Sequence, residues 1–403
     1  MKTKNISFKN SKGILLSAKL ELPADQHPDA YAIFAHCFTC NKNLTAVRNI
    51  SKALTQNGFG VLLFDFTGLG QSEGDFSETN FTSNIQDLED VSEYMTQELQ
   101  APKLIVGHSL GGAAAIFAGK NISSIQAIAT IGAPSSPQHI QHLFKNDIEK
   151  IEANGKAIVT IGGRSFPISK QLIDDISKTN MHEVVKTLRK PLLLLHSPQD
   201  TVVGIHNASE IYAQAMHPKS FVSLDGADHL LSNKEDSLYA GQIIAHWGSR
   251  YIDKSTEKKL KTSEQVVARI GNNGFTTDII AAGHSLTADE PENVGGNNFG
   301  PSPYNLLLSS LGACTAMTLR MYADRKQWDL EEVIVHLSHN KDYAQDCKEC
   351  DQPKSKIDLI EKRIELIGNL DETQKKRLLE IADKCPVHKT LHQPVSVTTT
   401  LIS

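Results

Sequence analysis

Short apolar runs recur along the first 230 residues of the chain, and longer segments of helical pattern separate them. Runs that are apolar along their whole length suit parallel strands covered by helices on both faces. An antiparallel hairpin, ISFKN with ILLSAKLEL, is expected to precede them. The pattern therefore predicts an α/β fold built on a doubly wound, mostly parallel sheet. The runs are AYAIFAH, FGVLLFDF, KLIVGHS, IQAIATIG and PLLLLHS.

The segment from about residue 135 to 190 interrupts this rhythm. It contains a polar helical stretch, a glycine-containing hairpin candidate (GKAIVTIGGRSFPI) and another helix. We interpret it as a small cap inserted into the strand order.

The pattern changes again after Trp247. The charged stretch YIDKSTEKKLKT, residues 251–262, is typical of a linker. Beyond it, residues 263–403 predict an α+β order, and 403 residues are too many for one hydrophobic core. We therefore expect two domains, 1–250 and 263–403. The second domain's predicted elements are strands EQVVARI and FTTDIIAAG, a long helix from Pro303 to about Lys326, strands VIVHLSH and KIDLIEKRIELIG, a helix to Lys384, and a final strand VSVTTTLI.

Charge and composition exclude several classes of protein. The formal charge is only -5, and no block of Lys and Arg interleaved with aromatic residues occurs, so no nucleic-acid partner is expected. The start MKTKNISFKN has no apolar stretch, and no 18 uninterrupted apolar residues occur, so we expect a cytoplasmic protein without a membrane partner. Six cysteines are too few for a secreted disulfide framework, and a reducing compartment should keep them as thiols.

The pentapeptide GHSLG, residues 107–111, follows the run KLIV and opens the apolar helix GGAAAIFAG. Glycines on both sides let the strand turn sharply into the helix and leave Ser109 exposed above the sheet. A serine nucleophile needs a histidine base and an acid that orients the base. Asp200 ends PLLLLHSPQD and His229 follows the next strand, which gives the chain order Ser, Asp, His. Asp225 and Asp228 are alternative candidates for the acid. Because they stand so close to His229 in the sequence, they fit the loop beside the histidine better than the strand end from which an acid orients it.

Two backbone N–H groups are candidates for the oxyanion hole. Phe38 follows the run AYAIFA, and Leu110 follows the candidate nucleophile. The glycine run from Gly68 to Gly74 is not the dinucleotide fingerprint, so no NAD site is expected, and the chemistry requires no cofactor.

The segment from about Lys12 to Gly248 resembles the α/β-hydrolases, close to their serine-peptidase-like and carboxylesterase branch. The run DFTGLGQS, residues 65–72, also matches the loop after the fourth strand in that branch. Where that family usually has His-Gly, this sequence has His36-Cys37. The resemblance implies hydrolysis of carboxylic esters through an acyl-enzyme.

In the second domain, Ser302 is placed to cap a helix whose first residue is Pro303. Cys314 falls on an apolar stripe of this helix, together with Leu307, Ser310, Leu311, Met317, Thr318 and Met321. The chain from about Ser263 to Ser403 resembles the OsmC/Ohr family. The resemblance rests on this helix, on DEPENVGG before it and on ADKCPVHKTL after it. The resemblance implies that Cys314 attacks a hydroperoxide, that Cys385 resolves the sulfenic acid, and that the domain forms an intertwined homodimer.

A nearby cation is needed to lower the pKa of such a thiol. Arg269 or Arg320 could supply that charge, and the sequence does not choose between them. Asn305 stands where the family commonly has a glutamate that positions the arginine. Two interpretations therefore stay open: active peroxide reduction, and a domain kept for dimerisation and for covering the esterase site.

Cys347 and Cys350 form a C-x-x-C, with His336 and His339 before it. The two histidines stand three apart on a predicted strand and so point to opposite faces. We favour an unused surface pair of thiols over an auxiliary redox pair or a zinc site, and we predict no metal.

The sequence thus predicts a serine hydrolase of the carboxylesterase type, acting on a small-molecule ester, with an OsmC-like domain that dimerises and covers the site. The alternative is a thiol-dependent organic hydroperoxide reductase that carries an inactive or accessory hydrolase domain.

Overall fold

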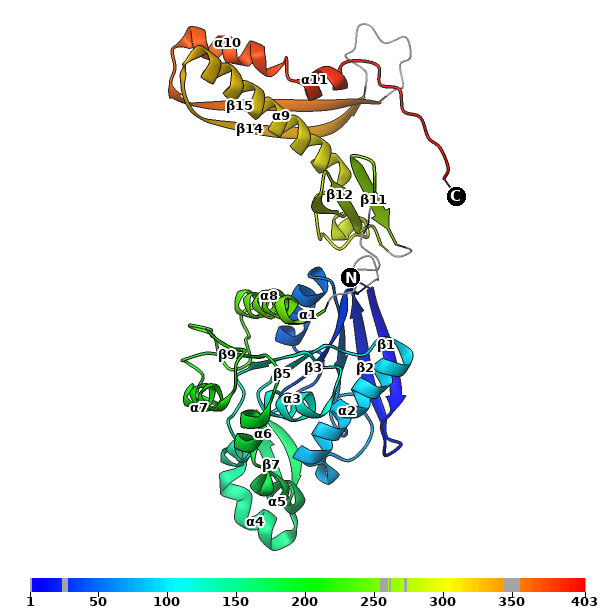
Figure 1. The fold of residues 1–403 in the computed structure, drawn as a ribbon, viewed down its shortest axis with the longest axis vertical. Helices are drawn as coiled ribbons and strands as arrows, with labels where there is room; N and C mark the ends of the chain where they lie inside the picture. Colours follow the sequence, from blue (N-terminus) through cyan, green and yellow to red (C-terminus); the bar gives the residue numbers. More distant parts are fainter. Residues whose placement is uncertain are drawn as a thin grey trace. The chain divides into compact units, whose positions relative to one another are not determined.

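Eight strands form one sheet in the computed structural model of the chain, in the order β1-β2-β4-β3-β5-β6-β9-β10 (Figure 1). β2 pairs antiparallel with both β1 and β4, and the pairs from β4 to β10 are parallel. The predicted hairpin and the mostly parallel sheet are therefore confirmed. The strands are β1 (Lys2–Lys9), β2 (Leu15–Leu22), β3 (Ala30–Ala35), β4 (Phe59–Phe64), β5 (Leu104–His108), β6 (Ala127–Ile131), β9 (Leu192–His196) and β10 (Lys219–Ser223).

By its contacts the chain divides into two units, Met1–Asn273 and Gly274–Ser403, which are described separately. The predicted linker at 251–262 lies before this division and includes residues outside the described chain, so the domain boundaries stay a prediction. No helix within the described ranges is long and apolar enough to cross a membrane. The structure describes residues 2–23, 28–161, 163–253, 260, 262–271, 274–343 and 356–402.

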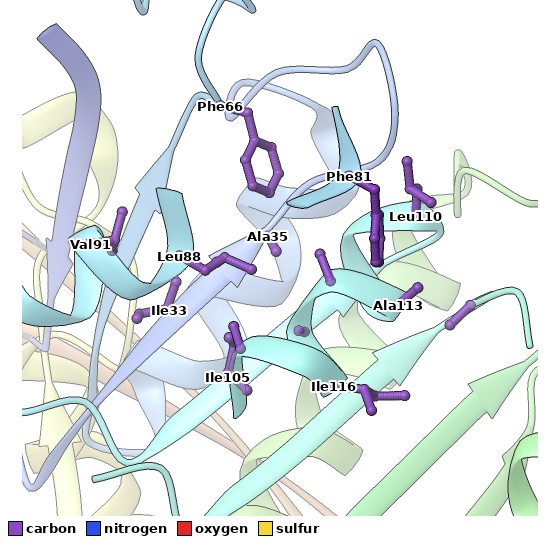
Figure 2. Packing of buried hydrophobic residues seen from close by; sticks show 14 of the residues in the cluster. Ile33, Ala35, Phe66, Phe81, Leu88, Val91, Ile105, Leu110, Ala113 and Ile116 are labelled. Carbon is purple, nitrogen blue, oxygen red and sulfur yellow. The ribbon is translucent and has the colours of Figure 1, made fainter. Parts of the chain in front are cut away.

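Alternate residues of the central strands face two different helical layers. In β3, Ile33 and Ala35 pack with helices α2 and α3, as Figure 2 shows, whereas Phe34 packs with α1 and α8. Because both faces are covered, all six residues of β3 are buried, which explains the uninterrupted apolar run. The helices of the first unit outside the cap are α1 (Thr45–Gln56), α2 (Phe81–Glu98), α3 (Leu110–Asn121), α7 (His206–Gln214) and α8 (Lys234–Tyr251).

The chain between β6 and β9 forms short elements instead of another strand of the main sheet. The predicted hairpin is present, since β7 pairs antiparallel with β8 and places Val159 opposite Phe166. Buried side chains of this segment, such as Phe144 and Ile176, join the core formed by α2 and α3. The elements are η2 (Pro137–Asp147), α4 (Ile148–Asn154), β7 (Lys156–Ile161), β8 (Arg164–Ser169), α5 (Lys170–Lys178) and α6 (Met181–Thr187).

A long helix, α9, dominates the second unit and lies along a two-stranded hairpin of β14 and β15 together with α10 (Figure 1). Helix α9 begins at Pro303 and ends at Lys326, as the sequence predicts, and Ser302 Oγ caps it. Two short strands that precede the helix, β12 and β13, pair antiparallel. The strand β11 (Val266–Ile270) lies before the division, at the end of the first unit. The elements of the second unit are β12 (Thr277–Ala281), β13 (His284–Ala288), η3 (Glu292–Val294), α9 (Pro303–Lys326), β14 (Asp329–Tyr343), β15 (Lys356–Asn369), α10 (Glu372–Ala382) and α11 (Pro386–Leu391).

The buried face of α9 differs from the predicted stripe. Leu319 and Ala323 pack against the hairpin and α10, whereas Met317 and Met321 are 65% and 72% exposed. The predicted stripe that carries Cys314 is therefore not the face of α9 that packs within the unit. The position of the β14–β15 hairpin decides which face of α9 is buried. Apolar side chains on the opposite face of α9 are exposed.

The predicted final strand, VSVTTTLI, is also wrong. Residues 394–402 have no regular secondary structure, and Val397 and Leu401 are 83% and 96% exposed. A strand forms only where another strand supplies hydrogen bonds, and within the described chain none pairs with this segment.

Candidate active site

Ser109 stands at the sharp turn between β5 and α3. Its backbone lies at φ 55° and ψ -127°, a conformation that residues with side chains rarely adopt, and its N–H donates to the Ile131 carbonyl oxygen over 2.8 Å. A Cβ at Gly107 would overlap the backbone of Gly111, so the turn requires glycine at that position. The G-x-S-x-G spacing thus holds the serine in a strained turn at the carboxyl end of the sheet.

A chain of hydrogen bonds joins Ser109 to His229 and Asp200. His229 Nε2 lies 3.0 Å from Ser109 Oγ, and His229 Nδ1 lies 2.7 Å from Asp200 Oδ2. The second carboxylate oxygen, Asp200 Oδ1, accepts the N–H groups of Val202 and Val203, each over 2.8 Å. When Nδ1–H donates to Asp200, Nε2 is free to accept the serine proton.

Burial and hydrogen bonding act in opposite directions on Asp200. Burial raises the pKa of its carboxyl group, but the hydrogen bonds from His229, Val203 and Val202 together hold that pKa below its usual value. Asp200 is therefore ionised at neutral pH, as the acid that orients a histidine base must be.

The two rival acids have other partners. Asp225 accepts a hydrogen bond from Ser223 Oγ over 2.6 Å. Asp228 accepts the N–H and the hydroxyl of Ser232, each over 2.7 Å, which closes the turn after the histidine.

His108 is buried directly before the candidate nucleophile and holds the loop that carries His229. Its Nε2–H donates to the His229 carbonyl oxygen over 2.7 Å, and the two ring centres are 5.1 Å apart. Burial, with a smaller contribution from the neighbouring His229, lowers the pKa of His108 to about 3. His108 is therefore neutral at neutral pH and donates this bond without placing a charge beside His229.

The loop after β3 carries Phe38 and lies against the N-terminus of α3. β3 and β5 pair in parallel, and a Cβ at Gly111 would overlap the carbonyl oxygen of His36. Among the described residues, no protein group accepts the N–H of Phe38 or of Leu110. Two unpaired N–H donors near the serine suit the stabilisation of a developing oxyanion.

Cys37 and Cys40 form a disulfide, with their Cα atoms 5.3 Å apart. The expectation that all six cysteines are thiols is therefore wrong for this pair. The turn between them is closed by a hydrogen bond from the Cys40 N–H to the Cys37 carbonyl oxygen over 3.1 Å, and this turn brings the two side chains within bonding reach. Cys314 and Cys385 are free thiols.

Two polar contacts tie the disulfide loop to the rest of the first unit. The Lys42 ammonium forms a buried ion pair with Asp65, which also accepts the Lys42 N–H over 2.7 Å. From the cap, Arg164 Nη2 donates to the Thr39 carbonyl oxygen over 2.7 Å. The loop is thus held from both the sheet side and the cap side.

A row of aromatic rings runs beside the same loop. Phe38 lies 5.5 Å from Phe76, and Phe76 lies 5.6 Å from Phe166 of the cap hairpin, measured between ring centres. The Arg164 guanidinium lies 5.4 Å from the centre of the Phe166 ring. The cap therefore contributes an apolar surface and a cation close to the loop that carries the candidate oxyanion donor.

The second unit places its two described cysteines together. The Cys385 sulfur accepts the His388 N–H over 3.3 Å and lies 3.6 Å from the Oγ1 atom of Thr315, the residue after Cys314 on α9. Burial raises the pKa of the Cys385 thiol, but these hydrogen bonds and nearby Lys362 together hold it below its usual value. Cys314 is half-buried on α9.

The two arginines that are candidates for activating the thiol lie on different elements, Arg320 on α9 and Arg269 on β11. Arg320 donates to the carbonyl oxygens of Leu330 and Glu331 at the start of β14 and lies 3.4 Å from Asp324, so its guanidinium is held on these oxygens. Arg269 is half-buried on β11. A thiolate-activating role of either residue stays a prediction.

Asn305 lines a groove of about 480 Å³ between α9 and β14. Its backbone N–H donates to the side-chain oxygen of Ser302, the residue that caps the N-terminus of α9, over 3.3 Å. The groove is lined in addition by Leu308, Ser309, Gly312, Ala313, Ala316, Val335 and Leu337.

The C-x-x-C at Cys347 and Cys350 lies outside the described residues, so its interpretation stays a prediction. The two histidines before it each have an acidic partner: His336 lies 2.9 Å from Glu365, and His339 lies 2.8 Å from Asp358. Among the described residues, no three His, Cys, Asp or Glu side chains gather where they could hold a metal ion.

Sequence reasoning missed three features around Ser109. The C-x-x-C spacing of Cys37 and Cys40 was a signal for a redox pair, although no second pair accompanies it in that domain. His108 stood inside the motif, but its partner is a carbonyl oxygen 121 residues away, which no local pattern reveals. The contact of Arg164 with Thr39, in the loop after β3, likewise joins residues 125 positions apart.

Two family models match separate parts of the chain. The model described as serine aminopeptidase, S33, matches residues 26–150, and the model described as OsmC-like protein matches residues 295–400. The first match includes Ser109, and the second includes Cys314 and Cys385.

Individual proteins resemble the first unit. The esterase domain of a Rhodothermus marinus protein is 45% identical over 62% of this chain and 99% of its own, with a TM-score of 0.53. The uncharacterized protein YfhR of Escherichia coli O157:H7 is 24% identical over 224 residues, 55% of this chain and 71% of its own length. Lysophosphatidylserine lipase ABHD12 of Danio rerio is 29% identical over 175 residues, 42% of this chain and 43% of its own.

Because His108 is buried in its neutral form, the free energy of unfolding depends on pH. Below about pH 6.5 the unfolded chain binds a proton at His108 that the folded chain does not, so stability is full above that pH and falls as the pH drops toward 3. We expect this residue to account for a loss of about 2 kcal/mol between pH 8 and pH 5. In His108→Gln, which retains an N–H donor but does not titrate, urea unfolding should depend less on pH than in the wild type.

Urea unfolding is best followed in a Trp328→Phe background, in which Trp247 reports on the first unit. His246→Gln, at an exposed position, is the matched control and should keep the wild-type slope. Equal slopes for His108→Gln and the wild type would contradict the assignment of a neutral, buried His108.

Proposed function

The chain belongs to the α/β-hydrolases in its first unit and to the OsmC-like proteins in its second, and from this we propose that it hydrolyses carboxylic esters with Ser109 as the nucleophile. The observation that carries the proposal is the pair of hydrogen bonds that joins Ser109, His229 and Asp200, at 3.0 and 2.7 Å. The 45% identity to an esterase domain from Rhodothermus marinus supports the choice of esters.

In the proposed first step, Ser109 Oγ attacks the ester carbonyl carbon while His229 Nε2 accepts the hydroxyl proton. Asp200 keeps the Nδ1–H tautomer and stabilises the imidazolium. The carbonyl oxygen becomes an oxyanion that accepts the N–H groups of Phe38 and Leu110. Collapse of this intermediate expels the alcohol, which takes its proton from His229, and leaves the acyl-serine.

In the second step, water attacks the acyl-serine while His229 accepts a proton from it. The carboxylic acid leaves and the serine is restored, so no cofactor enters the balance. We propose small esters as substrates, because the cap is short and its Phe166 packs against Phe76, which in turn contacts Phe38.

Release of p-nitrophenol from short-chain esters tests this function. Ser109→Ala should abolish turnover, and Asp200→Asn should lower kcat by about 10⁴-fold, because the histidine tautomer is then wrong. Asp225→Asn is the matched control, since Asp225 bonds Ser223 instead of the histidine, and should stay near the wild-type rate. Near-normal turnover by Ser109→Ala would reject the proposed nucleophile.

The free thiol of Cys385 lies 3.6 Å from Thr315, the residue after the free thiol Cys314 on α9, and this favours a second candidate function, reduction of organic hydroperoxides by the second unit. The Cys314 thiolate would attack the peroxide oxygen, giving an alcohol and a sulfenic acid. The Cys385 thiol would then condense with the sulfenic acid, release water and form a disulfide, which an external dithiol would reduce.

Consumption of cumene hydroperoxide with dithiothreitol tests the second function. The wild type and Ser109→Ala should consume peroxide at equal rates, and Cys314→Ser should show only the uncatalysed rate. Peroxide turnover by the wild type without any ester turnover would reverse the ranking of the two functions. If Cys314→Ser retained the wild-type peroxide rate, the thiol mechanism would be wrong.

We also propose that the second unit forms a homodimer that covers its exposed apolar surface. Met317 and Met321 on α9 are 65% and 72% exposed, and the apolar side chains of the segment 395–402 are exposed as well. Exposed apolar side chains that lie together often mark an interface with another protein. Intertwined pairing, which the OsmC resemblance implies, would give the C-terminal segment a strand partner from the second copy.

Light scattering of the full chain should give twice 44.2 kDa. Met321→Glu should shift the population toward the monomer, because it places a charge in the proposed interface. Ile158→Glu changes a residue of the first unit that is 73% exposed, similar to Met321, and should leave the dimer intact. A monomeric wild type would overturn the proposal.

A further inference from the structure

The disulfide between Cys37 and Cys40 encloses the two residues of the oxyanion loop, Phe38 and Thr39. Phe38 carries the proposed oxyanion donor, so the crosslink lies one residue from an N–H that the reaction uses. Both cysteines are buried, in the loop that follows β3. A reversible bond at this place can change the backbone of the loop without touching the three side chains of the proposed triad.

One residue of the turn between Cys37 and Cys40 has an unfavourable backbone conformation. Thr39 lies at φ 63°, in the left-handed region that glycine or asparagine usually occupies, and its β-branched side chain makes that conformation unfavourable. Such strain persists only where the surroundings enforce it. The disulfide and one hydrogen bond, from Cys40 to Cys37, close this turn.

A change in the turn would reach the proposed oxyanion donor and the cap. The backbone of His36 is in close contact with Gly111, at the N-terminus of α3 two residues beyond Ser109. On the other side, the Thr39 carbonyl oxygen accepts Arg164 of the cap hairpin over 2.7 Å. Lys42 and Asp65 anchor the loop only beyond the second cysteine.

We infer that Cys37 and Cys40 are a redox site that keeps the oxyanion loop competent as the disulfide and disables it as the dithiol. In the balanced step, an external dithiol gives two electrons and two protons to the disulfide, forming two cysteine thiols and its own disulfide. Thr39 then relaxes toward negative φ, and the Phe38 N–H turns away from the oxyanion. The effect on turnover rests on the proposed esterase function; the change in the loop does not.

The test compares oxidised full-length protein with protein reduced by dithiothreitol, using p-nitrophenyl ester turnover. Alkylation and mass spectrometry verify the state of Cys37 and Cys40 in each sample. Reduction should lower kcat by about ten- to a hundredfold with a smaller change in KM, which is less than the roughly hundred- to thousandfold cost of losing a whole donor. Reoxidation with oxidised glutathione should restore kcat, which shows that the loss of activity is reversible.

Two variants assign the effect to this pair. Cys37→Ser/Cys40→Ser should have the low kcat of the reduced wild type and should not respond to dithiothreitol. Cys314→Ser breaks the other described pair of cysteines, and a response to reductant that disappears in this variant would overturn the assignment. Complete alkylation of Cys37 and Cys40 with unchanged kcat would overturn it as well.

Hydrogen exchange separates a failure of this inference from a failure of the esterase proposal. If neither redox form hydrolyses esters, the proposed function fails, and exchange of the amides in residues 36–42 decides the redox effect on the loop. Faster exchange after reduction, absent in Cys37→Ser/Cys40→Ser, would support the redox site. Equal exchange in the two redox forms would reject it.

Discussion

The parallel pairing of β3 with β5 is the contact on which the candidate active site depends. It brings the carboxyl ends of both strands to one edge of the sheet, so that the loop after β3 meets the N-terminus of α3. The approach is possible only because Gly111 has no side chain, since a Cβ there would overlap the carbonyl oxygen of His36. Ser109 and the proposed oxyanion donors are neighbours for this reason, although Phe38 and Ser109 are 71 positions apart.

Two neutral histidines hold the loops that carry His229 and Asp200, the proposed base and the proposed acid. His108 donates to the carbonyl oxygen of His229, and His196 donates to the carbonyl oxygen of Val203, next to Asp200, each over 2.7 Å. Burial lowers the pKa of both, so each supplies a hydrogen bond without a positive charge. The carboxylate of Asp200 can then act on His229 without competition from a nearby imidazolium.

The described cysteines of the two units are in different oxidation states. In the first unit a disulfide closes a strained turn next to the proposed oxyanion donor. In the second unit Cys385 and Cys314 are free thiols, and Cys385 lies 3.6 Å from Thr315, the residue after Cys314. The same unit leaves Met317 and Met321 exposed. Ester hydrolysis itself needs no electrons, so the proposed redox change in the first unit would act through the shape of the loop, whereas the thiols of the second unit are proposed to react with substrate themselves.

The sequence alone determined the features that depend on near neighbours. The apolar runs predicted the central strands, the G-x-S-x-G spacing predicted the turn at Ser109, and Ser302 with Pro303 marked the start of α9, because backbone conformation follows from residues a few positions apart. Tertiary structure decided which groups meet across long stretches of chain: His108 with the His229 carbonyl, and Arg164 with Thr39. It also decided that Met321 is exposed and that residues 394–402 form no strand, because burial and strand pairing depend on which other elements cover a segment.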